Sequence, residues 1–254
     1  MVGRSLFLTD PLLMSCLAER AAQIQDQITE ATRCSGRTPN SVTLLAVSKT
    51  HPPESIAEAC SAGLSLFGES RVQEARAKIP LCPSKARWHF VGHLQRNKIR
   101  HALPLFELLH GVDSLEIASD INRIATELGL FPRILLEVNL AGESSKFGFR
   151  TETLRAQIEP LLSLQRLQIE GLMTIPPPAH QPEDSRKFFV ALRELKDQLT
   201  SEFNLPLAEL SMGMSEDYAV AIEEGATLVR IGTALFGHRS GKTWNPSKSQ
   251  SLDE

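Results

Sequence analysis

Val42-Thr43-Leu44-Leu45-Ala46-Val47-Ser48 is the stretch that decides the fold of this 254-residue chain. It consists mostly of β-branched and aliphatic residues without polar alternation, which is typical of a strand buried on both faces of a parallel sheet. Further short apolar segments of the same kind follow it. They span residues 64–68, 88–92, 108–112, 134–139, 167–172, 209–211 and 227–232, so the sequence predicts eight strands.

Segments with helical spacing of apolar residues separate these strands. They cover residues 53–62, 71–79, 99–106, 114–128, 151–163, 182–203 and 217–224. Strands that alternate with helices predict an α/β fold with a parallel sheet. The count of eight, and the lack of a GxGxxG motif after the first strand, favour a single eight-stranded parallel (β/α)8 TIM-like barrel over an open Rossmann sheet.

One domain is expected, with an extra helix before the first strand. Leu17, Ala21, Ile24, Ile28 and Ala31 recur at helical spacing and predict that amphipathic helix. We expect residues 1–14 to form a disordered extension rather than a secretory signal, because Asp10-Pro11 interrupts its apolar run. Residues 15–238 are the predicted barrel, and residues 239–254 are a loose tail.

The composition indicates a globular protein and excludes several classes of partner. The chain is 42% hydrophobic with a net charge of −3, which offers no bulk attraction to nucleic acid or anionic lipid. No apolar run approaches the length of about 20 residues that a membrane helix needs. The basic cluster at residues 96–101 has two interpretations, a solvated helix face or an anion site, of which the first is favoured.

The four cysteines, Cys16, Cys34, Cys60 and Cys82, are widely spaced and form no CxxC motif. This spacing is typical of neither a zinc site nor a thioredoxin-like site and suits a reducing compartment. The sequence therefore predicts a cytoplasmic protein.

A lysine stands at the end of the first predicted strand. In an eightfold barrel the reacting groups lie at the carboxyl ends of the strands. Lys49 would project into the barrel mouth, where loss of hydration lowers an amine pKa and makes the amine nucleophilic. An ordinary lysine at the rim of the barrel is an equally good interpretation of its position alone.

Two glycine-containing turns follow the seventh and eighth predicted strands, where such barrels usually bind phosphate. They comprise residues 211–217 and 230–234. Gly213 and Gly232 would let the backbone approach an anion closely. Ser215 and Asp217 have a simpler interpretation as helix caps. Both turns together, with a lysine across the barrel from them, indicate a phosphate-bearing aldehyde, and pyridoxal 5′-phosphate (PLP) is the cofactor of that kind.

Seven ordered motifs in this chain resemble the PLP homeostasis proteins, the PLP-binding barrels of the bacterial YggS type. The resemblance spans Val42 to Gly237. They are LAVSKT (45–50), FGE with VQE (67–69, 72–74), WHFVGHLQ with NK (88–95, 97–98), SKFG (145–148), GLMTI (171–175), LSMGMS (210–215) and VRIGT (229–233).

The resemblance implies a fold like the barrel domain of alanine racemase and a Schiff base between Lys49 and PLP. It also implies that Ser211, Gly232 and Thr233 bind the phosphate. Two further residues would complete the site: Arg230 would lie near the ring and phosphate, and Met173 would line the pocket. Lys146 matches a family position thought to influence PLP exchange, with an exposed loop lysine as the alternative.

The sequence departs from the family pattern at two positions and offers one pair that resembles metal ligands. Ser70 replaces the usual asparagine, and His51 replaces a second lysine after Lys49. His89 and His93 are four residues apart, but one lies within a strand and the other beyond it. We therefore expect no metal site there.

The expected role is non-catalytic. Racemisation on this type of barrel uses a lysine and a tyrosine from a partner domain, whereas the single tyrosine here, Tyr218, is expected to point away from the mouth. We therefore expect a carrier or regulator in PLP (vitamin B6) homeostasis, with PLP-dependent apoenzymes or a regulatory protein as partners. The alternatives are a low-activity PLP-dependent racemase-like enzyme and a regulatory module whose PLP state a partner protein senses.

Overall fold

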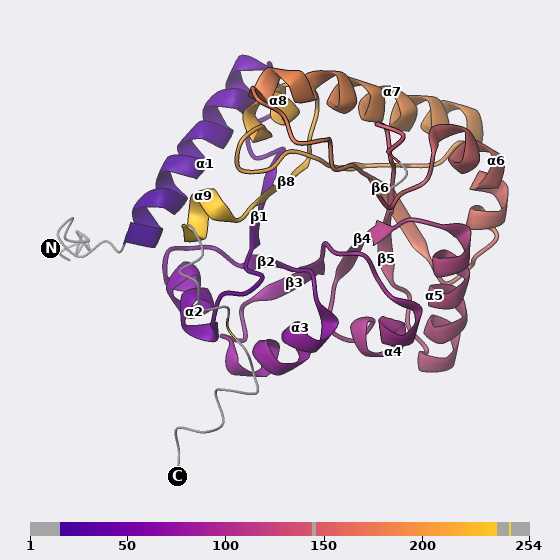
Figure 1. Ribbon diagram of the computed structural model, residues 1–254, viewed down its shortest axis with the longest axis horizontal. Helices are drawn as coiled ribbons and strands as arrows, with labels where there is room; N and C mark the ends of the chain where they lie inside the picture. Colours follow the sequence, from indigo (N-terminus) through magenta and orange to yellow (C-terminus); the bar gives the residue numbers. More distant parts are fainter. Residues whose placement is uncertain (1–15, 144–145, 238–243, 245–254) are drawn as a thin grey trace, which may run out of the picture.

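The computed structural model describes residues 16–143, 146–237 and 244, and in them parallel strands close into one barrel (Figure 1). Each strand pairs with its neighbours in sequence, and β8 pairs with β1 to complete the circle. The predicted (β/α)8 barrel is thus confirmed, and the open-sheet alternative is wrong. The strands are β1 (Thr43–Val47), β2 (Leu66–Glu69), β3 (Arg87–Phe90), β4 (Leu108–Val112), β5 (Arg133–Glu137), β6 (Gln168–Met173), β7 (Glu209–Ser211) and β8 (Leu228–Ile231).

Helices surround the barrel as an outer layer (Figure 1). Short 3₁₀ turns extend three of the connections: η2 (Ile79–Leu81), η3 (Arg96–Lys98) and η4 (Pro182–Ser185). The α-helices are α1 (Cys16–Cys34), α2 (Pro53–Ser61), α3 (Val72–Lys78), α4 (Ile99–Ala102), α5 (Leu115–Leu128), α6 (Thr151–Leu162), α7 (Arg186–Phe203), α8 (Tyr218–Glu223) and α9 (Thr233–Phe236).

Two apolar cores explain why the strands lack polar alternation. Along β1, Leu45 faces the barrel interior and Ala46 faces the helical layer, and both are fully buried. Burial on both faces therefore favours apolar residues at successive positions of the strand. The interior core is a small cluster of large side chains: Leu45, Leu66, Leu108, Leu135, Met173 and Leu228.

The predicted N-terminal helix is present as α1, and all five of its predicted apolar positions are buried. It packs against α8, α9 and α2, beside the seam between β8 and β1 (Figure 1). After α1, the Arg37 side chain donates hydrogen bonds to the carbonyl oxygens of Ile222 and Ala226, at 2.9 and 2.7 Å. These bonds fix the end of α1 to the segment that leads into β8.

Some boundaries differ from the predictions. The helix expected over 99–106 ends at Ala102, and the four-residue α9 was not expected because it is too short to show a period. The predicted extension 1–14 and tail 239–254 lie outside the described residues, apart from Trp244. Among the described helices, none combines the length and the apolar character needed to cross a bilayer.

Candidate functional site at the carboxyl ends of the strands

Lys49 follows β1 at the mouth of the barrel and is half-buried. Leu45 belongs to the interior core and Ala46 to the outer core, so strand alternation directs residue 49 inward. The next residue, Thr50, has a φ of 70°. Its carbonyl oxygen accepts a 3.0 Å hydrogen bond from the backbone N–H of Trp244.

A buried ion cluster holds the backbone on both sides of Lys49. The ammonium of Lys78, with no exposed surface, donates to Glu69 at 2.8 Å, to Glu74 at 2.7 Å and to the carbonyl oxygen of Ser48 at 3.0 Å. The Ser48 hydroxyl donates to Glu69 at 2.7 Å, and the Thr50 N–H donates to Glu74 at 2.5 Å. Burial raises the pKa of Glu69, which the nearby Lys78 opposes. The cluster therefore fixes residues 48 and 50, and with them the position of Lys49.

The predicted phosphate turn after β8 lies next to the end of β1, because β8 is the neighbour of β1 with Ala46 opposite Ile231. The turn after β7 belongs to the next strand around the barrel. Gly213 has a φ of 90°, and an added Cβ would lie 2.6 Å from the Cβ of Ala221. At Gly232 an added Cβ would lie 3.3 Å from the carbonyl oxygen of Val47. Both glycines therefore allow a close backbone approach that a side chain would obstruct.

The Ser215 side chain does not cap the helix that follows β7, which was one of the two roles expected for it. The Asp217 carboxylate accepts a 2.7 Å hydrogen bond from the N–H of Met214 and so closes the turn before α8. The Ser215 hydroxyl instead accepts a 3.3 Å hydrogen bond from the N–H of Ala234, in α9. The hydroxyl thus lies beside Gly232 and Thr233, at the point where the two turns meet.

Ser211 is directed into the barrel interior rather than toward these turns. Its hydroxyl is fully buried, lies 2.8 Å from Nδ1 of His110 and accepts a 2.7 Å hydrogen bond from Arg230. His110 Nε2 lies 3.0 Å from Nδ1 of His89. Because Arg230 only donates, the best-satisfied arrangement has Ser211 donating to His110 and His110 donating to His89. The hydrogen on Nε2 of His89 then has no acceptor within the described residues.

Burial keeps the two histidines of this interior chain uncharged. Burial lowers the pKa of His89 to about 4 and that of His110 well below its usual value, so both rings are uncharged at pH 7. Burial also lowers the pKa of Arg230 to about 10, which still leaves it charged. Arg230 donates further to the carbonyl oxygens of Ser211 and Thr174, at 2.7 and 2.8 Å. The guanidinium is therefore a fixed positive charge beneath the barrel mouth.

A carboxyl group lies across the mouth from Lys49. Glu137, the last residue of β5, is only 8% exposed, and burial raises its pKa to about 7, with the charge of Asp113 adding to the rise and that of Arg230 opposing it. Lys146 follows in the loop after β5, where its ammonium contacts Glu143 at 3.2 Å and the carbonyl oxygen of Pro176 at 3.3 Å. It is half-buried there, on the side of the barrel opposite β1.

The histidine pair separates as expected. His89 belongs to the interior chain, whereas His93 hydrogen-bonds Asp113 at 2.7 Å and stacks on Phe147 with ring centroids 3.7 Å apart. Across the described ranges, no group of three or more histidine, cysteine or acidic side chains is arranged to bind a metal. Tyr218 points away from the mouth, as expected, because its hydroxyl donates to Gln27 of α1.

Comparison with known proteins identifies the family. The sequence model of the family described as alanine racemase, N-terminal domain, matches residues 21–240. A pyridoxal phosphate homeostasis protein of Aquifex aeolicus is 45% identical over 222 residues, covering 87% of this chain and 97% of the relative. The chain belongs to the pyridoxal phosphate homeostasis protein family. Another member, from Pseudomonas aeruginosa, is 45% identical over 228 residues, covering 89% of this chain and 97% of its own.

Solved structures agree with this assignment to the pyridoxal phosphate homeostasis proteins. PipY of Synechococcus elongatus, solved with PLP bound, is 42% identical with a TM-score of 0.77, and the match covers 87% of this chain and all of PipY. An alanine racemase of Clostridium difficile is 17% identical with a TM-score of 0.68, over 89% of this chain and 59% of the racemase. That second likeness extends to the fold alone.

The structure brings together only part of the site predicted for this member of the pyridoxal phosphate homeostasis proteins. Gly232 and Thr233 lie in the turn after β8, adjacent to the end of β1, and Met173 pairs with Ser211 on the inner wall. Lys146 lies on the other side of the barrel. Sequence reasoning placed Ser215 in the predicted phosphate turn but did not name it as a site residue. It missed the Lys78 cluster, for which the only sequence signal was the matching motif at residues 72–74.

Of the two departures from the family pattern, His51 stacks on Phe236 of α9, with ring centroids 4.8 Å apart. Its ring therefore packs against the helix that begins at the second turn. Ser70 instead lines a separate cavity after β2.

Proposed function

We propose that this chain binds PLP as a Schiff base on Lys49 and serves in PLP homeostasis as a carrier or regulator. The observation that carries the proposal is the adjacency of β1 and β8, which sets Lys49 beside the turn at Gly232. PLP supplies an aldehyde that condenses with a lysine amine and a phosphate that needs hydrogen-bond donors. The relatives' family name and the PLP in PipY support the same cofactor.

In this proposal the two turns hold the phosphate and the barrel interior orients the ring. The backbone N–H groups of Gly232 and Thr233, and the hydroxyls of Thr233 and Ser215, are the phosphate donors. Ser211 does not contact the phosphate directly in this proposal, because its hydroxyl is bonded to His110 and Arg230. It instead helps to position the Arg230 guanidinium. Arg230 provides positive charge beneath the ring, and Met173 contributes apolar surface.

A non-catalytic role fits the groups around the mouth. Tyr218 bonds to α1, so it is not available as a second proton-transfer group opposite Lys49. Glu137 brings negative charge to the mouth once ionised, which disfavours the carboxylate of an amino-acid substrate. We propose that PLP-dependent apoenzymes, or a regulatory protein, receive the cofactor. The four unpaired cysteines suit a cytoplasmic location.

The visible spectrum of the purified protein tests cofactor binding. We expect a band at about 420 nm, which is typical of a PLP Schiff base, and its loss in Lys49→Ala. Lys146→Ala is the matched control, because Lys146 lies at the rim on the opposite side. It should keep the band but release PLP more slowly to an added apoenzyme. A colourless wild-type protein that takes up no PLP would overturn the proposal.

Turnover separates the carrier from a racemase-like enzyme. We expect no steady racemisation of alanine or other amino acids by the PLP-loaded protein, together with reactivation of an added PLP-dependent apoenzyme. Racemisation that disappears in Lys49→Ala would instead identify an enzyme.

A further inference from the structure

A chain of hydrogen bonds crosses the barrel interior below the mouth. It joins four side chains, each at most 5% exposed: His89 on β3, His110 on β4, Ser211 on β7 and Arg230 on β8. The successive links measure 3.0, 2.8 and 2.7 Å. In the closed ring of strands β4 lies opposite β8, so His110 brings a contact from the far wall to the side of Arg230.

The Arg230 guanidinium is bonded to neutral oxygen atoms. Two of its acceptors are the backbone carbonyl oxygens of Ser211 and Thr174, and the third is the Ser211 hydroxyl. No carboxylate of a described residue is bonded to it, and the charges of Glu137 and Asp217 act on it through space. The backbone fixes the two carbonyl acceptors, whereas the third bond depends on which way the Ser211 O–H points.

His110 controls the direction of that hydroxyl. A guanidinium only donates, so Ser211 Oγ must offer it a lone pair and direct its own hydrogen elsewhere. Nδ1 of His110, 2.8 Å away, accepts this hydrogen when the ring proton is on Nε2. His89 favours that tautomer, because its Nδ1 lies 3.0 Å from Nε2 of His110 and can accept the Nε2 hydrogen.

This arrangement requires an uncharged ring at position 110. An imidazolium would carry a hydrogen on Nδ1, and its positive charge would repel the nearby Arg230. Full burial lowers the pKa of His110 well below its usual value, and the charges of His89 and Arg230 act in the same direction. At neutral pH the ring is therefore an acceptor toward Ser211.

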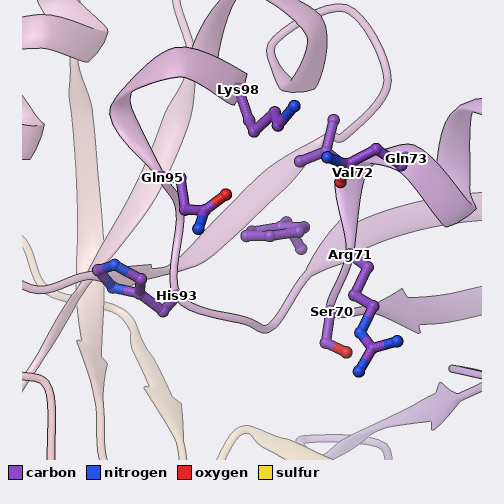
Figure 2. A pocket seen from close by; sticks show the side chains of 8 residues that line it. Ser70, Arg71, Val72, Gln73, His93, Gln95 and Lys98 are labelled. Carbon is purple, nitrogen blue, oxygen red and sulfur yellow. The ribbon is translucent and has the colours of Figure 1, made fainter.

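The other histidine close to β3 belongs to a different part of the molecule. His93 lines the separate cavity after β2, which Ser70 and Arg71 border on another side (Figure 2). It bonds to Asp113 at 2.7 Å. His110 is not among the lining residues of that cavity, so changes at position 110 act on the interior chain alone.

We propose that His110 is a positioning residue for the cofactor: by accepting the Ser211 hydroxyl, it fixes the Arg230 guanidinium below the mouth where PLP binds. This inference rests on the proposed function and adds to it a residue from the opposite wall. His110 needs no contact with PLP for this role. Its loss should weaken PLP binding without preventing the Schiff base on Lys49.

Two variants of nearly equal shape test this role. In His110→Asn, Oδ1 lies close to the place of Nδ1, because both atoms are bonded to Cγ, whereas His110→Leu has no acceptor there. Both variants lose the Nε2 bond to His89 and leave a similar space. We expect His110→Asn to bind PLP about tenfold more tightly than His110→Leu, because the lost bond orients a charged donor.

Titration of the PLP band at about 420 nm measures these affinities, and thermal unfolding without PLP measures stability. The melting temperature of His110→Asn should be no higher than that of His110→Leu, because burial of a second amide group costs free energy. A purely structural role would instead make PLP affinity follow the melting temperatures.

Ser211→Ala tests whether His110 acts through the hydroxyl. This variant should weaken PLP binding about tenfold, and adding it to His110→Leu should weaken binding by less than about twofold further. Leu66→Val is the control, because it removes a methylene from the interior core outside the chain. It should melt at a lower temperature and bind PLP within about twofold of the wild type.

If His110→Leu does not fold, His110→Asn is compared with His110→Asn/Ser211→Ala, and the same tenfold loss is expected. Equal affinities of the Asn and Leu variants, or a full further loss on adding Ser211→Ala to His110→Leu, would overturn the role of His110. Failure of the proposed function is distinguishable, because the wild-type protein would then be colourless and show no band to titrate.

Discussion

At the scale of single residues, Lys78 is the charge on which the geometry of the mouth depends. It is the cation between two buried carboxylates, and it also binds the Ser48 carbonyl oxygen. Such a cluster adds little net stability over apolar packing, but removal of one partner leaves uncompensated buried charge. Its value here is the fixed position of the residues that flank Lys49.

Lys78→Met should therefore destabilise the protein by about 3–5 kcal/mol and weaken PLP loading. Chemical denaturation and the PLP band measure the two effects. The second change Glu69→Gln should restore part of the stability, because it removes a stranded carboxylate. Lys187→Met, at an exposed position, is the control and should change stability by less than about 0.5 kcal/mol. Equal denaturation midpoints for Lys78→Met and the wild type would contradict this role.

Because its pKa is raised, Glu137 should make the free energy of unfolding decrease as the pH rises. A salt-bridged acid, whose pKa is lowered, has the opposite effect. Its pKa rises from 4.5 to about 7 on burial, so between these values the folded state binds more protons than the unfolded state. Stability should therefore fall as the pH rises through this window. The shift corresponds to about 3 kcal/mol as an upper value.

Glu137→Gln keeps the shape of the side chain and removes the titration. We expect the variant to be more stable than the wild type by about 2–3 kcal/mol at pH 8, and nearly equal to it at pH 4.5. Denaturant titrations at the two pH values measure the difference. Glu19→Gln, on the exposed face of α1, is the control for the change of a carboxyl group to an amide. An advantage of Glu137→Gln that is the same at both pH values would contradict the assigned pKa.

At the scale of elements, the turn between β7 and α8 is held by packing as well as by backbone conformation. Gly213 has a positive φ, and its Cα faces α8, where an added Cβ would lie 2.9 Å from the Cα of Tyr218. Gly129, after α5, has a φ of 69° but nothing within 4 Å of an added Cβ. Substitution of Gly129 measures the cost of a positive φ alone. Substitution of Gly213 measures that cost together with the cost of the steric contact with α8.

Gly129→Ala should cost about 1 kcal/mol, the price of a left-handed conformation for a residue with a Cβ. Gly213→Ala should cost more than twice as much, because α8 must also shift, and it should weaken PLP binding by distorting the turn. Thermal unfolding and PLP titration of both variants give the comparison. Equal melting temperatures would mean that α8 moves away without cost.

At the scale of the whole molecule, the apolar patterns predicted the barrel because each strand is buried on two faces and leaves a local signal in the sequence. The position of Lys49 at the mouth of the barrel could be predicted for the same reason, because it follows the clearest strand. Two other features could not be predicted from the sequence: the Lys78 cluster and the hydrogen bond between Ser215 and α9. Each joins residues that come together only when the barrel closes. His110 and Ser211, 101 positions apart, are the extreme case.

The seam between β1 and β8 has a consequence for the synthesis of the protein. Lys49 leaves the ribosome early, but the turn at Gly232 that would hold the cofactor's phosphate is nearly the last part of the barrel to be made. A growing chain, or a fragment cut short before β8, thus has the Lys49 amine without the turn that lies beside it in the complete barrel. The cofactor would then be retained only by completed chains.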